Sequence, residues 1–477
     1  MSEIARVDAR GAQLMPALHL QPARTLAEVY HTMVLRPLET PAELNAFYRN
    51  MDTVRGGDKI EQIRRGLLRA HSVSYFKGFF MGHSGVGKST EINRLTGKVA
   101  DKFRPIRFKV LDDLNGTDFR PFDVLFVIIY DLMTQIHELG KSDSIPEGLL
   151  NELYTWFQTT EYTQIYGAQE QREESQEIGT PKKLAEIVGL LFNVKDALRY
   201  SVERKKQVTE YSYRTIGQLI KLINRLFTAA NIAIQSEGQE WLVIGEEFDK
   251  PGVSPERVEE FFITHANILT DLEAHLIFNI PIALAYSEKT QFLPKIGRFC
   301  LFDTPVYNAD HTPHMEGRSV LRTIMDARMI PELFEEGQQE RLIVASGGNL
   351  SELFSMTTAA ADNAALRTGE LGKIGELDVT QAINEKRREY RNALGSSPHE
   401  KNPISYEDKA KRLVAIYQQE PGHDVPDAVL YKLLLARAVQ EFNGEGWFGV
   451  HPLVVDILKA HEKLTDPVGT ELAGGTF

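Results

Sequence analysis

Two spacings of apolar residues alternate along the first 315 positions of the chain. Short runs rich in β-branched and aromatic residues predict strands at 74–81, 105–111, 241–244 and 275–287. Apolar residues repeated at helical spacing predict helices at 58–72, 91–99, 122–139, 184–205, 213–230 and 256–273. Strands that alternate with helices are typical of an α/β domain with a mostly parallel sheet. The pattern therefore predicts an α/β fold for residues 46–315.

The pattern differs on either side of this region and at one place inside it. The first 45 residues mix polar and apolar positions with several prolines, so we expect an N-terminal arm at 1–45. Residues 140–183 are irregular and end in a polar, acidic stretch, which indicates an insertion or a mobile loop. Together with the helices predicted after it, this stretch predicts a helical insertion at about 140–235. After residue 315 helices follow one another up to the polar break GSSPHEKNP. We therefore expect a helical domain at 316–395 and a terminal domain at 396–477.

Composition narrows the classes of protein to consider. The length of 477 residues suits two or three domains, and a net charge of -12 excludes a whole-surface basic footprint for nucleic acid or anionic lipid. The single cysteine, Cys300, excludes an internal disulfide and a cysteine-based metal cluster, and we interpret it as a small buried hydrophobe. The histidines show no zinc-protease spacing. No apolar run suits a membrane span or a signal peptide, so we expect a cytoplasmic protein without membrane contact.

The stretch after the first predicted strand, GHSGVGKS at 82–89, matches the phosphate-loop pattern G-x-x-x-x-G-K-S/T at every required position. Glycines let consecutive backbone amides face phosphates, and the following helix directs its N-terminus at the same anion. Lys88 is expected to reach the β- and γ-phosphates of ATP, and Ser89 to complete a Mg²⁺ shell. An accidental glycine-rich turn is the alternative, but the flanking strand and helix favour nucleotide binding. The candidate nucleotide contacts are Gly82, Ser84, Gly85, Val86, Gly87, Lys88, Ser89 and Thr90.

The predicted strand at 241–244 is followed by acidic residues, which a phosphate loop needs to hold Mg²⁺ and to activate water. Glu246 is the candidate metal ligand, directly or through water, and Glu247 is the candidate general base. Asp249 either supports one of these roles or caps the next turn. A solvated acidic loop is the alternative. The long separation in sequence between Lys88 and Glu246 also supports an insertion between them.

These segments, in this order, resemble the AAA+/STAND branch of prokaryotic P-loop ATPases. GHSGVGKSTEINRL is similar to the branch's opening motif, and LVIGEEFDK to its acidic strand. LIFNIPIALAYS resembles the sensor strand that places a polar residue near the γ-phosphate, here Ser287 or Asn279. ASGGNLSELF resembles the lid motif, and LLLARAVQEFNGEGWFGVHPLV the end of a winged-helix domain. The resemblance implies a P-loop ATPase domain at 46–315, a helical lid at 316–395 and a winged-helix-like domain at 396–477.

Two positions depart from the family pattern. The acid that binds metal is Glu246, where most of the family has aspartate, and the position of the lid arginine is Ser351. Without that cation we expect hydrolysis to be slow or dependent on a partner. Arginines that could act on a neighbouring subunit's ATP are Arg298, Arg328, Arg387 and Arg388; the last two lie in a basic stretch that is otherwise a solvated helix face.

The resemblance implies an ATP-dependent switch that controls assembly, as a homo-oligomer or with a separate effector protein. Several such ATPases belong to antiphage defence systems. A DNA-engaged ATPase, such as a transposition regulator or helicase loader, is the main alternative, and a P-loop kinase is a third. From residue 397 onward twelve acidic residues outnumber eight basic ones, which disfavours a DNA-binding terminal domain.

Overall fold

A computed structural model describes residues 19–159, 205–396, 403–443 and 447–464. The chain divides into two compact units, which are described separately. The sheet unit comprises Gly57–Phe302 and Gln418–Gly446. The helical unit comprises Met1–Gly56, Asp303–Tyr417 and Trp447–Phe477. Because neither unit is one continuous stretch of sequence, the predicted boundaries at 45, 315 and 395 stay a prediction.

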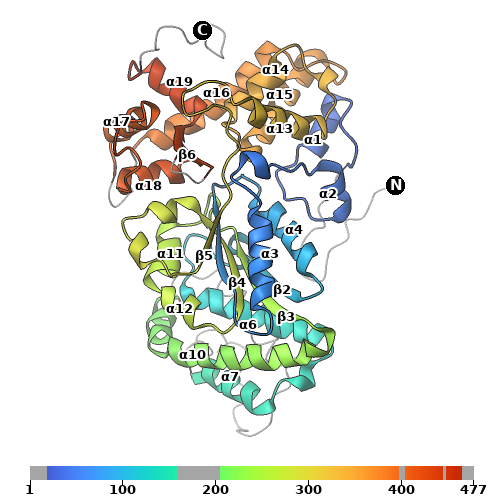
Figure 1. Ribbon diagram of the computed structural model, residues 1–477, viewed down its shortest axis with the longest axis vertical. Coiled ribbons are helices and arrows are strands. Elements are labelled where there is room, and N and C mark those ends of the chain that lie inside the picture. The colour runs from blue at the N-terminus through green and yellow to red at the C-terminus, as the bar shows by residue number, and fades with distance from the viewer. Residues whose placement is uncertain (1–18, 160–204, 397–402, 444–446, 465–477) are drawn as a thin grey trace, which may run out of the picture. The chain divides into compact units, whose positions relative to one another are not determined.

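A five-stranded parallel sheet forms the centre of the sheet unit, in the order β2-β3-β4-β1-β5 (Figure 1). The strands are β1 (Lys77–Gly82), β2 (Phe103–Lys109), β3 (Glu240–Glu246), β4 (His275–Pro281) and β5 (Gly297–Cys300). Gly82 pairs with Pro281, and Gly245 pairs with Phe278. The carboxyl ends of β1, β4 and β3 therefore lie side by side at one edge of the sheet, where ligands bind in open α/β sheets.

The sheet strands agree with the four that the apolar pattern predicts, apart from their ends. The predicted strand at 275–287 is shorter, because β4 ends at Pro281 and a 3₁₀ turn follows at Ile282–Tyr286. Proline cannot donate a hydrogen bond to a neighbouring strand, so the strand stops there. The short strand β5 was not predicted, because its sequence GRFC carries no alternating pattern.

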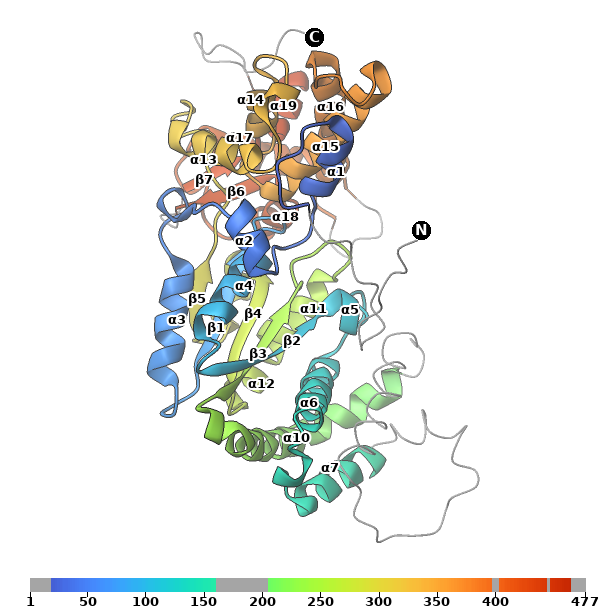
Figure 2. The same cartoon turned by 90° about the vertical axis from the view of Figure 1, so that its right-hand side faces the viewer.

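Alternate residues of the strands pack into two separate cores. Phe80 of β1 and Ile244 of β3 face α3 (Lys59–Ala70) and α4 (Lys88–Val99). Phe79 and Met81 face the opposite side. The helices of that second core include α6 (Pro121–Glu138), α7 (Glu147–Thr159), α10 (Lys205–Ile234), α11 (Pro255–Glu259) and α12 (Ala266–Asp271). Figure 2 shows the sheet between α3 on one side and α6 on the other.

The predicted insertion at 140–235 is helical where the structure describes it, in α7 and α10. The acidic stretch and nearly all of the predicted helix at 184–205 lie outside the described residues. Further elements of the sheet unit are α5 (Val110–Asp113), α18 (Ala428–Leu435) and β6 (Val439–Phe442). α18 packs against the 3₁₀ turn that follows β4.

The helical unit is built around α15, which packs against α1 and α16. Its elements are α1 (Leu26–Thr32), α2 (Pro41–Phe47), α13 (Met315–Asp326), α14 (Gln338–Ala345), α15 (Leu350–Thr368), α16 (Glu376–Leu394), α17 (Tyr406–Tyr417), β7 (Trp447–Val450) and α19 (Pro452–Ala460). The described part of the expected arm thus contains two helices. Thr40 and Glu43 form a capping box on α2, and Ala23 bridges to Met329. Among the described helices, none combines the length and apolarity that crossing a bilayer requires.

Candidate nucleotide-binding site

The phosphate loop connects the last residue of β1, Gly82, to the first residue of α4, Lys88. Gly85 and Gly87 have φ values of 86° and 105°, in the left-handed region that residues with a Cβ rarely adopt. At Gly82 a Cβ would lie 2.6 Å from the carbonyl oxygen of Leu301. The three glycines of the motif are therefore required by the backbone itself. Val86 is fully buried, so its side chain belongs to the core beneath α4.

Lys88 is held by three oxygen atoms. Its Nζ donates to the backbone carbonyls of Gly82 at 3.0 Å and His83 at 2.7 Å, and to Asp249 Oδ2 at 2.8 Å. The side chains of Lys88 and Asp249 are only 4% and 5% exposed. A nucleotide phosphate would thus compete with Asp249 for the ammonium group. Asp249, for which the sequence indicates either a supporting role or a cap of the next turn, contacts the lysine of the phosphate loop.

Glu246 lies fully buried at the carboxyl end of β3. It accepts hydrogen bonds from the guanidinium of Arg107 on β2 and from Asn279 Nδ2 on β4, the latter at 3.2 Å. Arg107 also donates to Asn93 on α4 at 2.5 Å. Sequence reasoning missed Arg107. The pairing of β2 with β3 brings this cation to Glu246. The sequence of neither strand indicates which strand lies next to it.

Glu247 follows β3 with a φ of 72°, which is uncommon for a residue with a Cβ and is often found at functional sites. Burial raises the pKa of its carboxyl group, although Lys109 opposes this shift. A carboxyl whose pKa is raised toward neutrality is suited to accept a proton from water. The backbone and the electrostatics therefore fit the role of general base.

The structure distinguishes the two candidates for the sensor residue. Asn279 is buried on β4 and contacts Glu246, and its Oδ1 has no hydrogen-bond partner among the described residues. Ser287 lies beyond the end of β4, and its Oγ donates to Glu259 of α11 at 3.4 Å. The sheet thus brings Asn279, rather than Ser287, to the acidic end of β3. A nucleotide contact from Ser287 stays a prediction.

Mg²⁺ prefers oxygen ligands and usually shares them with substrate phosphates. The hydroxyl of Ser89, in the first turn of α4, and the carboxylates of Glu246 and Asp249 are donors of this kind. Within the described ranges no group of three or more His, Cys, Asp or Glu is arranged to hold a metal ion. The donor set therefore fits an ion held jointly with phosphates, provided that Glu246 or Asp249 exchanges its present cationic partner.

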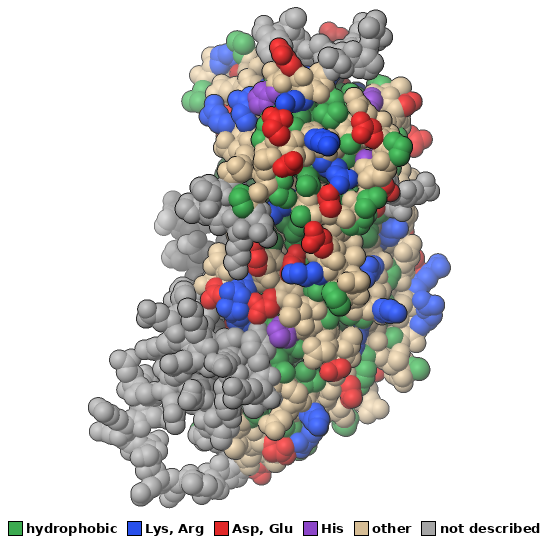
Figure 3. Space-filling model, turned by 90° about the vertical axis from the view of Figure 1, so that its left-hand side faces the viewer, with side chains coloured by type: hydrophobic (Ala, Val, Ile, Leu, Met, Phe, Trp, Pro, Cys, Tyr) green, Lys and Arg blue, Asp and Glu red, His purple; other side chains and the backbone are tan. Residues whose placement is uncertain are grey.

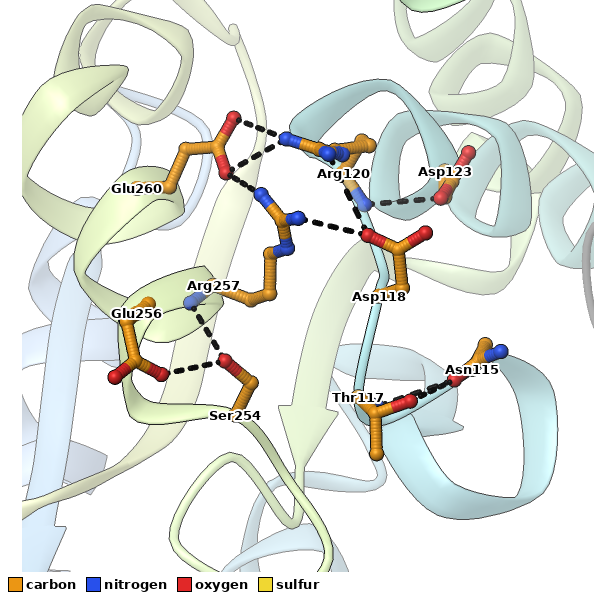
Figure 4. Close-up of polar contacts among 9 residues, drawn as sticks. All are labelled: Asn115, Thr117, Asp118, Arg120, Asp123, Ser254, Glu256, Arg257 and Glu260. Atoms are coloured by element: carbon orange, nitrogen blue, oxygen red, sulfur yellow. Dashed lines mark hydrogen bonds and ion pairs between the residues drawn. The ribbon is translucent and has the colours of Figure 1, made fainter. Parts of the chain in front are cut away.

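The acidic loop is the segment between β3 and α11, and it carries Glu247 and Asp249. Side chains of alternating charge hold the end of this loop that leads into α11 (Figure 4). Arg257 of α11 donates to Glu260 at 2.6 Å and to Asp118 at 2.8 Å. Arg120 donates to the same Glu260 at 3.1 Å and lies 3.4 Å from the same Asp118. Both arginine side chains are about a quarter exposed. The network joins α11, which follows the acidic loop, to the segment before α6.

The four candidate trans-acting arginines have different surroundings. Arg328 is buried in the helical unit, donates to the carbonyls of Phe47 and Ile324, and stacks over the rings of Phe47 and Phe354. This enclosure suits a structural role and disagrees with a trans-acting one. Arg387 pairs with Asp456 at 2.7 Å. Arg298 and Arg388 are exposed.

Cys300 agrees only in part with its interpretation as a small buried hydrophobe, because its burial is intermediate. It is only partly exposed at the end of β5, and its neighbours include the second core of the sheet unit. Burial raises the pKa of its thiol to about 12, so the thiolate needed for nucleophilic chemistry is disfavoured at neutral pH.

No protein-family model matches the sequence, and no curated protein matches it. Solved structures similar to the chain include a Walker-type ATPase of Pyrococcus abyssi, at 13% identity and a TM-score of 0.38, covering 90% of this chain and 99% of that one. Cdc6p from Pyrobaculum aerophilum has 11% identity, a TM-score of 0.34 and coverages of 87% and 96%. A RuvB mutant of Thermotoga maritima has 9% identity and a TM-score of 0.33, and the match covers 89% of this chain and 100% of that one.

The chain's own geometry has the features of one fold. The sheet is parallel. The glycine loop between β1 and α4 and the acids at the end of β3 lie at the same edge of it. The chain has an α/β P-loop NTPase fold.

Proposed function

We propose that this protein binds ATP with Mg²⁺ at the phosphate loop and hydrolyses it. The observation that carries the proposal is the position of Lys88. Lys88 is the first residue of α4 and follows the glycine loop. Its ammonium group donates hydrogen bonds to oxygen atoms at the edge of the sheet where β3 ends in acidic residues. A loop of backbone amides, a helix N-terminus and a lysine together form a site for phosphate groups.

The roles of the residues follow from their surroundings. Lys88 binds the phosphates in exchange for Asp249, and the amides of the loop bind the same anion. Glu247 accepts a proton from the attacking water on its carboxylate. Asn279 orients Glu246 through its amide. Mg²⁺, when bound through Ser89 and Glu246, neutralises phosphate charge.

We propose further that hydrolysis operates a switch of the AAA+/STAND kind, which controls assembly with itself or with a separate effector protein, in antiphage defence. The order of the sequence motifs supports this role. A DNA-engaged ATPase is less well supported. From residue 397 onward acidic residues outnumber basic ones, whereas a phosphate-tracking domain is basic. On the one face that Figure 3 shows, basic and acidic side chains are interspersed.

Two substitutions test the enzymatic part of the proposal. Lys88→Ala should abolish binding of a fluorescent ATP analogue, and Glu247→Gln should bind it normally but hydrolyse ATP at least about a hundredfold more slowly. Arg225→Ala, which removes a cation from an exposed pair with Glu152, is the control. Unchanged hydrolysis by Glu247→Gln would remove that residue as the base. Unchanged binding by Lys88→Ala would remove the site.

The switch is tested by purifying the Glu247→Gln variant from its native host with and without ATP. We expect a larger complex, with a partner or with further copies of the chain, only when ATP is present. A complex of the same size in both conditions would contradict the switch. DNA-stimulated turnover with a steep dependence on salt would instead favour the DNA-engaged alternative.

A further inference from the structure

A segment from near the end of the chain folds as part of the sheet unit. Residues 418–443, which we call the docked segment, contain α18 and β6 and are separated from Phe302 by more than a hundred residues of the helical unit. α18 packs against the 3₁₀ turn Ile282–Tyr286 and against β6. The docked segment carries none of the motifs of the proposed ATPase site, yet one of its polar side chains contacts the phosphate loop and two others contact neighbouring elements of the sheet unit.

The first contact reaches the phosphate loop. Arg437 follows α18 with a φ of 57°, and its Nη1 donates to the carbonyl oxygen of Ser84 at 3.4 Å. Its backbone amide donates to Leu434, which closes the end of the helix. The left-handed conformation is uncommon for arginine, and here it holds a guanidinium beside the loop that is proposed to bind phosphate.

The other two contacts reach the 3₁₀ turn that follows β4 and the helix α11 that follows the acidic loop. The hydroxyl of Tyr286 donates to Glu441 of β6 at 2.7 Å. Tyr431 of α18 is hydrogen-bonded to Glu259 of α11, which also accepts from Lys289 at 3.0 Å. Burial raises the pKa of both tyrosine hydroxyls and of Glu441. Buried polar groups of this kind are costly to leave without partners, so the docked segment has a defined position on the core.

We propose that Arg437 is a positioning residue that couples the docked segment to the phosphate loop, so that nucleotide binding tightens the docking of α18 and docking raises nucleotide affinity. The coupling rests on the proposed function, because it requires a nucleotide at the loop. Phosphates bound there place negative charge close to the guanidinium, which strengthens its attraction to the loop. Linkage then makes the effect reciprocal, since each event must favour the other by the same factor.

The full-length protein provides two measurements of the coupling. The first is hydrogen exchange of α18 with and without ATP. The second is the affinity for a fluorescent ATP analogue. In the wild type, ATP should slow exchange in α18. In Arg437→Ala this slowing should disappear and the affinity should fall about tenfold, within the usual range of coupling between sites.

Two more substitutions separate the guanidinium from the backbone. Arg437→Gly suits the left-handed φ but removes the cation, so it should behave like Arg437→Ala. Arg437→Lys keeps the charge and should restore most of the affinity. Arg225→Ala loses an arginine from the exposed pair with Glu152 and should match the wild type in both measurements.

The outcomes distinguish the coupling from the function on which it rests. The coupling would be overturned if Arg437→Ala bound the ATP analogue with wild-type affinity. It would also be overturned if ATP did not change hydrogen exchange of α18 in the wild type. Neither result would contradict the proposed ATPase function. A wild-type protein that does not bind the analogue would overturn the proposed function and the coupling with it.

Discussion

At the scale of single residues, Asp249 determines the charge that surrounds Lys88 in the phosphate loop. Both side chains are almost fully buried, and their charges neutralise each other. Removal of one partner from a buried ion pair leaves an uncompensated charge, whereas a phosphate can replace the lost carboxylate. Asp249 thus neutralises Lys88, and it would oppose the nucleotide binding that we propose for this site.

Asp249→Asn should lower the free energy of unfolding by about 3 kcal/mol without nucleotide, because Lys88 keeps its charge and loses its carboxylate. ATP should raise the melting temperature of this variant more than that of the wild type. Thermal unfolding at several ATP concentrations measures both effects. An equal ATP-induced shift in the two proteins would show that Asp249 does not compete with phosphate.

Glu247 should impose an acid limit on hydrolysis. Burial raises the pKa of its carboxyl, and only the deprotonated form accepts a proton. The single-turnover rate should therefore fall as the pH decreases through this raised value, at a pH above the ordinary pKa of glutamate near 4.5. Bound phosphates would raise the value further, since they are also negative. A rate that stays constant from neutral pH down to about 4.5 would contradict the role of Glu247 as the base.

At the scale of elements, β3 and α11 hold the acidic loop from its two ends. β3 is fixed between β2 and β4 in the sheet, and α11 is fixed by the charge network around Arg257. Between them, Gly252 approaches Gly116 so closely that a Cβ on Gly116 would lie 2.8 Å from the carbonyl oxygen of Gly252. The loop that carries Glu247 and Asp249 is therefore positioned by contacts outside the site.

Arg257→Ala should reduce kcat about tenfold and leave nucleotide affinity nearly unchanged, because it frees α11 without touching the phosphate loop. Its cost in stability should be about 1 kcal/mol, since the network is partly solvated. Steady-state kinetics together with an affinity titration separate the two effects. Arg225→Ala, whose exposed pair lies on α10 and α7, serves as the comparison. A loss of affinity as large as the loss of kcat would show that the network acts on the phosphate loop instead.

At the scale of the whole molecule, the chain passes from the helical unit to the sheet unit and back more than once. The phosphate loop, the acids of β3 and the docked segment all belong to the sheet unit. A ligand that binds only folded protein stabilises the part that it contacts, by about 2.7 kcal/mol at a hundred times its dissociation constant.

ATP should therefore slow hydrogen exchange in β1, β3 and α4 more than in α14 and α15 of the helical unit. Peptide-resolved exchange with and without ATP tests this difference, with Lys88→Ala as the control that should lose the effect. Equal protection of both units would contradict it.

The sequence alone was sufficient to predict the α/β class, most of the strands of the sheet and the residues of the phosphate loop. Each of these depends on local properties: the spacing of apolar residues, and glycines at positions where the backbone has a left-handed φ or leaves no room for a Cβ. The acids at the end of β3 were equally visible, because they follow directly from a short apolar run.

Only the tertiary structure decided which side chains meet. Arg107 reaches Glu246, Asn279 replaces Ser287 at the acidic end of β3, and Arg437 reaches Ser84 from 353 positions away in the sequence. Likewise, the tertiary structure brings Asp249 within hydrogen-bond distance of Lys88. Such contacts depend on the order of strands in the sheet and on a returning segment. Neither leaves a periodic pattern in the chain, because the energy of pairing distant segments comes from their mutual fit rather than from either segment alone.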